Sequence, residues 1–203
     1  AMLTRNRNLE PTGSHGRGPR GQGSEAVEDY AKAIYSMSGR IEGPVGTSAL
    51  AERLGVSPGT VTAMLKRMAT ESLVDYEPYQ GVELTERGKL LALEVIRHHR
   101  LLELFLAEIV GMPWDRVHDE AEILEHYISE DLEARIDEVL GSPSHDPHGD
   151  PIPDRDLDIA SDDSVPLGSL DPGESGKFVR VSDSDPGMLR YLAERGIDPG
   201  KLL

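Results

Sequence analysis

The sequence contains no cysteine, only 4% aromatic residues, and no apolar run near the roughly 20 residues that a membrane-spanning helix needs. The lack of cysteine excludes disulfides, thiolate zinc sites and thiol catalysis, so any bound metal must be held by oxygen and imidazole ligands. The N-terminus has no signal-peptide pattern. We therefore expect a soluble, cytoplasmic protein that does not associate with membranes.

Positive charge is also scarce. The chain has 21 Lys and Arg against 37 Asp and Glu, and its formal net charge is −16. The acidic residues are concentrated after residue 90. A chain this acidic should be repelled by DNA unless cations neutralise its carboxylates, so any DNA binding should depend on a metal.

Changes in composition divide the chain into five segments of a mainly α-helical protein. Residues 1–24, rich in Gly, Pro and Arg, predict a disordered basic arm, which could touch phosphates or have no function. Residues 25–90 predict a winged helix-turn-helix and residues 91–141 a helical block. Residues 142–163 predict a linker rich in Pro, Gly and Asp. Residues 164–203 predict one strand (176–181) and one helix (186–195). Because one strand and one helix cannot enclose a hydrophobic core, this segment is predicted to be a partial domain.

The helix-turn-helix is predicted from apolar spacing and capping residues. A first amphipathic helix begins at Glu25, and Thr47 is the expected cap of a second helix that Gly55 ends. Ser57 is the expected cap of a third helix, with Pro58 at its first position. Residues 74–84 then alternate around a glycine-containing turn, which predicts a β-hairpin in the place of a wing.

The N-terminal end of the third helix would enter the DNA major groove. Its side chains are small, so shape readout and methyl contacts would carry much of the specificity. The candidate DNA-binding residues are Ser57, Pro58, Gly59, Thr60, Thr62 and Ala63 on the bases and Lys66 and Arg67 on phosphates. Further candidates for the DNA backbone are Arg40, Arg53, Tyr79 and Lys89. A protein-interaction role for the helix-turn-helix stays open, although the wing favours DNA.

Histidines and carboxylates recur at helical spacing in the helical block. On a helix predicted at 114–128, Glu122, Glu125 and His126 stand at i, i+3 and i+4, and His118 lies one turn earlier. On the preceding helix, predicted at 85–109, His99 and Glu103 stand at i and i+4; another helix is predicted at 130–140. The E-x-x-E-H motif alone fits a solvated acidic face, but two histidine-carboxylate pairs on adjacent helices favour a metal site.

Five ordered motifs resemble one family. They are VEDYAKAIY (27–35), AERLGVSPGTVT (51–62), GVELTERG (81–88), RHHRLLE (97–103) and VHDEAEILEH (117–126), and they are similar to the diphtheria toxin repressor and manganese transport regulator family. The resemblance implies a winged DNA-binding domain, a helical dimerisation domain and hence a homodimer, and an SH3-like domain after a Pro-rich linker.

The resemblance also implies ligand sets. Asp29 would join Glu122, Glu125 and His126 at the regulatory metal site. A second site would use the histidine-carboxylate set completed by an acid of the third domain: His99, Glu103, His118 and either Asp183 or Asp185.

Two departures within the family bear on the metal. Iron-sensing members usually have Met in place of Asp29 and Cys in place of Glu122, whereas manganese-sensing members have Asp and Glu, as here. Hard oxygen ligands suit Mn(II), so manganese is favoured, with Fe(II) as the alternative because the third domain is commoner among iron-sensing members. Lys32 stands where two-domain manganese regulators carry Glu and could form a salt bridge with a carboxylate.

The sequence thus predicts a transcriptional repressor that binds double-stranded operator DNA when Mn(II) is bound and controls metal-homeostasis genes. The alternatives are an Fe(II)-dependent repressor of the same family, a metallohydrolase, and a metal-binding interaction module. We expect no enzymatic activity, because no motif supplies a nucleophile or an oxyanion hole.

Overall fold

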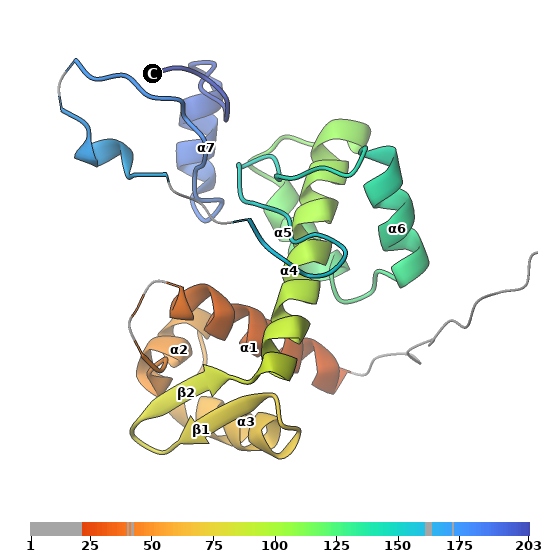
Figure 1. The fold of residues 1–203 in the computed structure, drawn as a ribbon, viewed down its shortest axis with the longest axis vertical. Coiled ribbons are helices and arrows are strands. Elements are labelled where there is room, and N and C mark those ends of the chain that lie inside the picture. Colours follow the sequence, from red (N-terminus) through yellow and green to blue (C-terminus); the bar gives the residue numbers. More distant parts are fainter. Residues whose placement is uncertain (1–21, 40, 42, 161–163, 172) are drawn as a thin grey trace, which may run out of the picture.

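A computed structural model of the chain describes residues 22–39, 41, 43–160, 164–171 and 173–203. The described part is mainly helical and forms three consecutive units (Figure 1). The first comprises α1 (Gln22–Ser38), α2 (Thr47–Leu54), α3 (Pro58–Thr70), β1 (Val74–Glu77) and β2 (Gly81–Leu84). The second comprises α4 (Glu86–Phe105), the π-helical turn η1 (Leu106–Val110), α5 (Val117–Leu124) and α6 (Glu130–Val139). The third contains the short turn η2 (Leu167–Ser169) and α7 (Pro186–Ala193).

Short-range signals produce the helix-turn-helix. The side chain of Ser57 accepts a hydrogen bond from the Thr60 amide at 3.1 Å, and Gly55 ends α2 in the left-handed conformation at φ 65°, both as predicted. The prediction that Thr47 caps α2 is wrong. Gly46 is the capping residue, because its carbonyl already accepts from the Leu50 amide at 3.0 Å, which makes Thr47 the first helical residue.

The predicted wing is confirmed as an antiparallel hairpin. Val74 pairs with Leu84, and Glu77 pairs with Gly81 across the turn. Val82 also exchanges backbone hydrogen bonds with Val45, which attaches the hairpin to the segment before α2. The inner face of the hairpin and the three helices enclose one hydrophobic core, whose fully buried members include Ile34, Val45, Leu50, Val61, Leu65, Met68 and Val82.

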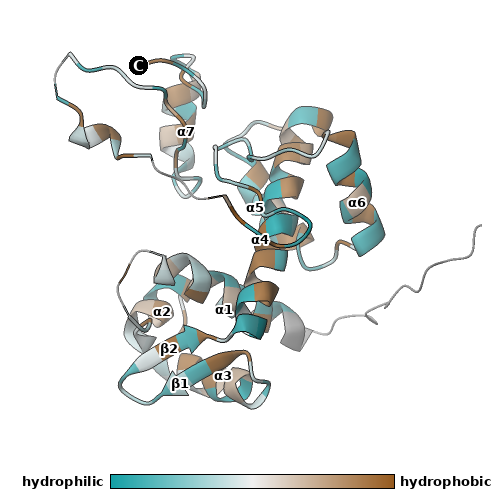
Figure 2. Cartoon of the chain, viewed as in Figure 1, coloured by the Kyte–Doolittle hydropathy of each residue, from teal (hydrophilic) through white to brown (hydrophobic). Residues whose placement is uncertain are grey.

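Helix α4 connects the first two units (Figure 1). The side chain of Thr85 accepts from the Gly88 amide at 3.1 Å and starts the helix, which packs against α1, α5 and α6. The predicted long helix is confirmed, with its last turn in the π form before Gly111 ends it. Apolar residues alternate with polar ones along α4, α5 and α6 (Figure 2), and a second buried cluster of six residues fills the space between these helices: Leu101, Leu102, Ala121, Ile128, Ile136 and Ile152.

The segment predicted as a linker, 142–163, is packed for much of its length. Ile152 and His148 are buried, and Ile152 belongs to the core of the helical unit. Two arginines of α4 explain the docking: Arg97 donates to the Pro153 carbonyl at 2.6 Å, and Arg100 donates to the Pro151 carbonyl. Largely buried guanidinium groups need hydrogen-bond acceptors, and these two carbonyls supply them.

The third unit differs from the prediction in one respect. Helix α7 is confirmed near the predicted position, but residues 176–181 do not form a strand. Lys177 makes only an isolated bridge to Leu202, and the Val181 amide donates to the His148 carbonyl at 3.0 Å. Residues 176–178 do pair with residues 200–203, as in the Phe178 amide that donates to the Lys201 carbonyl at 2.7 Å, but this pairing does not extend along residues 179–181.

The basic arm predicted at 1–24 lies outside the described residues, except that Gln22 to Ser24 already belong to α1. In the part of the chain that the structure describes, no helix is long and apolar enough to cross a membrane.

Candidate metal centre and DNA-binding surface

Three helices bring the predicted ligands together. α1 carries Asp29, α4 carries His99 and Glu103, and α5 carries His118 and Glu122. Helix α5 ends at Leu124, four residues before the predicted end at residue 128, so Glu125 and His126 lie in the turn that follows it. The ligand side chains therefore meet where the DNA-binding unit touches the helical unit.

The first cluster joins α1 to the turn after α5. His126 Nε2 lies 3.1 Å from Asp29 Oδ1 and 3.7 Å from Glu125 Oε1. These three residues offer ligand atoms within 4.8 Å of one another. Glu122, the fourth predicted member, instead groups with His99 and Glu125. The structure thus brings three of the four residues to one point and places Glu122 at an adjoining one.

Lys32 lies between the two parts of this cluster. Its Nζ is 2.7 Å from Glu122 Oε1 and 2.6 Å from Glu125 Oε1, so it forms the carboxylate salt bridge considered from the sequence. Burial disfavours the ammonium, but the two carboxylates outweigh burial and raise the pKa of Lys32. Lys32 is therefore a fixed positive charge inside the cluster.

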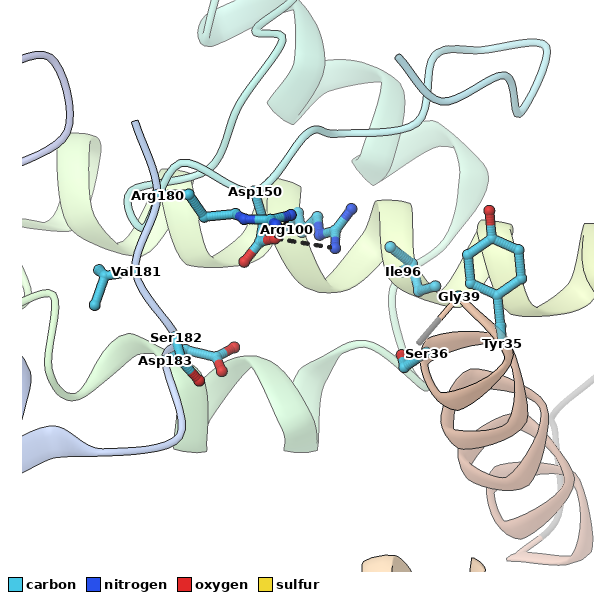
Figure 3. A pocket seen from close by; sticks show the side chains of 10 residues that line it. All are labelled: Tyr35, Ser36, Gly39, Ile96, Arg100, Asp150, Arg180, Val181, Ser182 and Asp183. Atoms are coloured by element: carbon cyan, nitrogen blue, oxygen red, sulfur yellow. Dashed lines mark hydrogen bonds and ion pairs between the residues drawn. The ribbon is translucent and has the colours of Figure 1, made fainter. Parts of the chain in front are cut away.

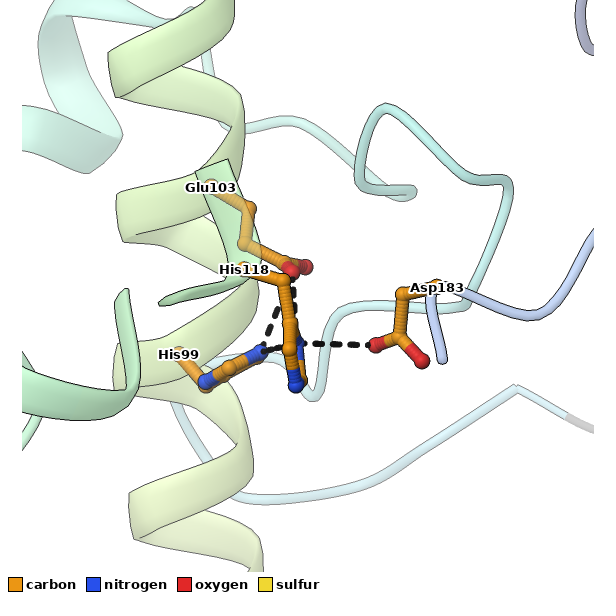
Figure 4. A group of neighbouring side chains, drawn as sticks. All are labelled: His99, Glu103, His118 and Asp183. Atoms are coloured by element: carbon orange, nitrogen blue, oxygen red, sulfur yellow. Dashed lines mark hydrogen bonds and ion pairs between the residues drawn. The ribbon is translucent and has the colours of Figure 1, made fainter. Parts of the chain in front are cut away.

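The second cluster contains all four residues predicted for it (Figure 4). Glu103 Oε1 lies 3.1 Å from His99 Nε2 and 3.3 Å from His118 Nδ1. Asp183, from the third unit, places Oδ2 3.2 Å from His118 Nδ1. The other candidate, Asp185, caps α7 by accepting from the Met188 amide, so the structure favours Asp183.

Three acidic or imidazole residues near the clusters were not predicted. Glu28 Oε2 lies 2.8 Å from His126 Nδ1, on the other side of the ring from Asp29. Asp146 and His148 form a third buried group with Glu103. The D-x-H pattern at 146–148 is the sequence signal for this group, but the segment was predicted as a linker and so as remote from the helices.

The third group contains two buried atoms that lack a hydrogen-bond partner among the described residues: Glu103 Oε2 and His148 Nδ1. They lie 3.7 Å apart. The other ring nitrogen of His148, Nε2, forms a hydrogen bond with the Trp114 carbonyl at 2.8 Å. Buried polar atoms left in this way are costly unless an ion or water satisfies them.

Carboxylates hold protons on the histidines. Burial opposes the charge on His126, but hydrogen bonds to Asp29 and Glu28 outweigh it and raise its pKa to about 10. Burial likewise opposes the charge on His99, whose bonds to Glu103 and Glu125 raise its pKa to about 9. At neutral pH both rings are cationic in the metal-free protein, and a metal that binds a ring nitrogen must displace a proton.

The second cluster follows the same rule. Hydrogen bonds to Asp183 and Glu103 raise the pKa of His118 to about 10, against the effect of burial. The pKa of Glu103 is lowered because its histidine neighbours outweigh its burial. Burial, together with the charges of Glu103 and Asp150, raises the pKa of Asp146 to about 7.

A cavity of about 470 Å³ opens beside Asp183 (Figure 3). The end of α1, the middle of α4 and the third unit line it, and Arg100, Asp150 and Arg180 give it a charged wall. Arg180 is 3.3 Å from Asp150. Asp183, the member of the second cluster that comes from the third unit, is therefore reached by solvent through this cavity.

Most candidate DNA-binding residues lie along α3 or in the turn of the wing, whereas Arg53 lies in α2 and Lys89 in α4. All are exposed except Thr62, which is half-buried and donates to the Pro58 carbonyl at 2.9 Å. A hollow of about 590 Å³ separates the two elements and is lined by Pro58, Thr62 and Lys66 of α3 and by Tyr76, Tyr79 and Gln80 of the hairpin, among others. Arg67 pairs with Glu71 at 3.0 Å on the solvent side, and Arg40 lies outside the described residues.

Comparison with known proteins connects these features. The family "Iron dependent repressor, N-terminal DNA binding domain" matches residues 23–82, and "Iron dependent repressor, metal binding and dimerisation domain" matches residues 85–154. The diphtheria toxin repressor of Corynebacterium glutamicum is 40% identical over 187 residues, which cover 87% of this chain and 81% of that protein. The chain belongs to the diphtheria toxin repressor family. The predicted family and fold class are therefore confirmed.

Further relatives in the diphtheria toxin repressor family respond to different metals. The iron-dependent repressor IdeR of Mycobacterium tuberculosis is 40% identical over 129 residues, 64% of this chain but only 56% of that protein, so the match spans little more than half of its length. A manganese-dependent transcriptional repressor solved in complex with manganese is 44% identical, with a TM-score of 0.80, over 87% of this chain and 81% of that one. The FeoA domain family matches residues 165–203, where a partial SH3-like domain was expected.

Proposed function

We propose that this chain is a homodimeric transcriptional repressor that binds operator DNA when Mn(II) occupies its ligand clusters. One observation carries the proposal: Asp29, in the first helix of the DNA-binding unit, and His126, after α5 of the helical unit, lie 3.1 Å apart in one ligand group. A metal ion bound by both residues would fix the position of one unit against the other.

The ligand residues suit a divalent first-row metal. Carboxylate oxygens and imidazole nitrogens make up both clusters, and the chain contains no thiolate to add to them. The buried Glu103 Oε2 and His148 Nδ1, which lack hydrogen-bond partners among the described residues, also fit an ion near the second cluster. In this proposal Asp29, Glu122, Glu125 and His126 serve the first site, and His99, Glu103, His118 and Asp183 serve the second.

The chain's own residues supply the coupling. A bound ion would contribute the positive charge that neutralises the converging carboxylates. Asp29 extends from a helix that packs against α4, so holding Asp29 against His126 fixes the orientation of α1. Since α1, α3 and the wing share one core, the DNA-binding surface moves with α1. A metal that binds more tightly to the orientation that fits DNA couples the free energy of metal binding to the free energy of DNA binding.

Manganese is the proposed ion because the first cluster is dominated by oxygen ligands, which suit Mn(II). The similarity to a manganese-dependent repressor supports this choice, and the similarity to iron-dependent IdeR keeps Fe(II) as the alternative. Affinity alone does not decide between them, because it rises across the divalent series whatever the biological choice.

The homodimer has support from the surface of the helical unit. Two pairs of adjacent apolar residues are exposed there: Ile109 with Val110, and Ile123 with Leu124. Clustered apolar exposure of this kind is typical of a protein interface. A dimer would bury these residues and present two copies of α3 to two DNA half-sites.

Binding to a duplex selected from random sequence in the presence of Mn(II) tests the proposal. Fluorescence anisotropy should show that Mn(II) strengthens binding of the wild-type protein, and that Asp29→Ala abolishes this gain. Asp119→Ala is the matched control, since Asp119 is an exposed acid of α5 outside the ligand groups. Metal-independent binding by the wild type, or an undiminished gain in Asp29→Ala, would contradict the proposal. Repeating the titration with Fe(II) without oxygen decides between the two metals.

A further inference from the structure

The third unit reaches the second ligand cluster through a short segment that crosses the docked loop containing His148. The Val181 amide donates a hydrogen bond to the His148 carbonyl at 3.0 Å. Next to it, Arg180 Nη1 lies 3.3 Å from Asp150 Oδ1 (Figure 3). Asp183, two residues after Val181, is the carboxylate that the third unit brings to the second cluster (Figure 4). The position of Asp183 therefore depends on how closely the two segments approach each other.

Gly149 lies where the two segments are closest. A Cβ atom at this position would overlap the Val179 carbonyl oxygen and lie 2.9 Å from the carbonyl carbon of the same residue. It would also lie 3.1 Å from the Arg180 Cα atom. These are backbone atoms, which cannot turn aside as the end of a flexible side chain can. Any side chain at position 149 would therefore push the two segments apart.

The loop that carries Gly149 is held firmly against the helical unit. The side chain of His148 is fully buried, forms a hydrogen bond with the Trp114 carbonyl at 2.8 Å and stacks on the Trp114 ring at a centroid distance of 5.8 Å. The other printed ion pair that ties α7 to the helical unit, between Arg190 and Asp115, is largely exposed on the arginine side and so contributes little. A clash at Gly149 would therefore be relieved by movement of the third unit.

We infer that Gly149 is a positioning residue: it lets the third unit dock closely enough to hold Asp183 against His118, and this docking does not require a metal. The statement about Asp183 rests on the proposed function, because the second cluster is part of it. The docking contacts themselves are made by protein groups alone. They hold Asp183 Oδ2 at 3.2 Å from His118 Nδ1, so the second cluster is assembled before an ion arrives.

A purely local role of Gly149 predicts something different. Its φ is +89°, a conformation that residues with a Cβ atom rarely adopt, so alanine is strained there even without a clash. Gly141 provides the matched control, since its φ is +74° and a Cβ atom there would meet nothing within 4 Å. Gly141→Ala thus carries the backbone strain without the clash. Only Gly149→Ala should detach the third unit.

Hydrogen–deuterium exchange of the metal-free protein tests the docking. In the wild type we expect residues 179–183 to be protected. Gly149→Ala should raise their exchange by at least about tenfold, while exchange in the helix-turn-helix stays the same. Gly141→Ala should leave residues 179–183 protected. If Gly149→Ala does not fold, Val181→Pro tests the same docking from the third unit, because proline has no amide to donate to the His148 carbonyl.

Mn(II) binding tests the effect on the second cluster. In an Asp29→Ala background, which disables the first cluster, Gly149→Ala should weaken Mn(II) binding roughly 10–100-fold, as the loss of groups that orient a ligand does. If Gly149 acts through Asp183, the variant with both Gly149→Ala and Asp183→Ala should bind no more weakly than Asp183→Ala alone. A merely structural effect of Gly149→Ala would add to the loss caused by Asp183→Ala.

The two failures are distinguishable. Unprotected residues 179–183 in the wild type, equal exchange in Gly149→Ala and Gly141→Ala, or additive losses of Mn(II) affinity would each overturn the inference. An Asp29→Ala protein that binds no Mn(II), although residues 179–183 are protected, would instead refute the proposed second metal site.

Discussion

The affinity for Mn(II) should rise steeply with pH, because the ligand histidines carry protons in the metal-free protein. Hydrogen bonds to Asp29 and Glu28 hold the pKa of His126 at about 10, against burial. An ion that takes a nitrogen of His126 must therefore release one proton at any pH well below 10. The association constant then grows tenfold per pH unit for each released proton, or about thirtyfold between about pH 7.0 and 8.5.

Titration calorimetry measures both quantities. The protons released follow from the binding heat in two buffers of different ionisation enthalpy, and the slope of the affinity against pH gives the same number. His118→Ala combined with Asp183→Ala weakens the second cluster, so that the first can be followed with an expected release of about one proton. His145→Gln, which removes an exposed histidine outside the clusters, should leave the release unchanged.

Proton linkage determines the direction in which the affinity for Mn(II) changes with pH. A histidine whose pKa is raised in the folded state stabilises the metal-free fold fully below about pH 6.5, and this stabilisation is lost as pH rises through its folded pKa of about 9 to 10. Metal binding displaces the proton, so the affinity for Mn(II) should rise with pH as the proton becomes easier to remove. A pH-independent affinity with no proton release would refute the assignment of His126 as a ligand.

Three further predictions concern the framework. Arg97→Met removes the guanidinium shared by half-buried Glu133 and buried Asp137, which keep His98 and Arg155 as partners, so it should lower the free energy of unfolding by about 1–3 kcal/mol in urea titrations and expose residues 142–160 to protease; unchanged protection would contradict the docking argument. Gly88→Ala would place a Cβ atom 2.0 Å from the Leu73 carbonyl oxygen, so we expect a loss of about 3 kcal/mol, read from the same titrations, and a loss below about 0.5 kcal/mol would show that this contact is not rigid. Val110→Asp should weaken the homodimer in sedimentation equilibrium by at least about tenfold if η1 lies in the interface, and an unchanged dimer constant would place the interface elsewhere.

Local signals explain why much of the fold could be predicted. Ser57, Pro58 and Gly55 act through their own backbone neighbours, so their positions in the chain suffice to mark where α3 starts and α2 ends. The cap of α2 was misplaced by one residue because Gly46 and Thr47 both fit a helix start, and only the backbone hydrogen bond to Leu50 distinguishes them.

Long-range contacts could not be predicted in the same way. Proline and glycine in residues 142–160 correctly indicated irregular backbone, but the acceptors that Arg97 and Arg100 need lie about 50 residues away in sequence. The same docking brings His148 to Glu103, which helical spacing alone does not suggest. The pattern at 176–181 resembled a strand, but only residues 176–178 pair with residues 200–203, and this pairing is too short for a strand.

Helical spacing correctly predicted that certain histidines and carboxylates lie together, because i, i+4 pairs such as His99 and Glu103 face the same side. It did not separate Glu122 from the Asp29 group, since that division depends on α5 ending before Glu125 and on Lys32 holding Glu122. Nor could it show that Glu28 and Asp29, adjacent in sequence, both reach His126.

The central claim is that metal and operator DNA bind cooperatively through Asp29 and His126, and reciprocal titration tests it most directly. For the wild type, Mn(II) should strengthen binding to a selected duplex by about 5–150-fold, and the duplex should strengthen Mn(II) binding by the same factor. In Asp29→Ala both factors should fall to about one. Equal DNA affinities of the wild type with and without Mn(II), under conditions where the ion is bound, would contradict the account.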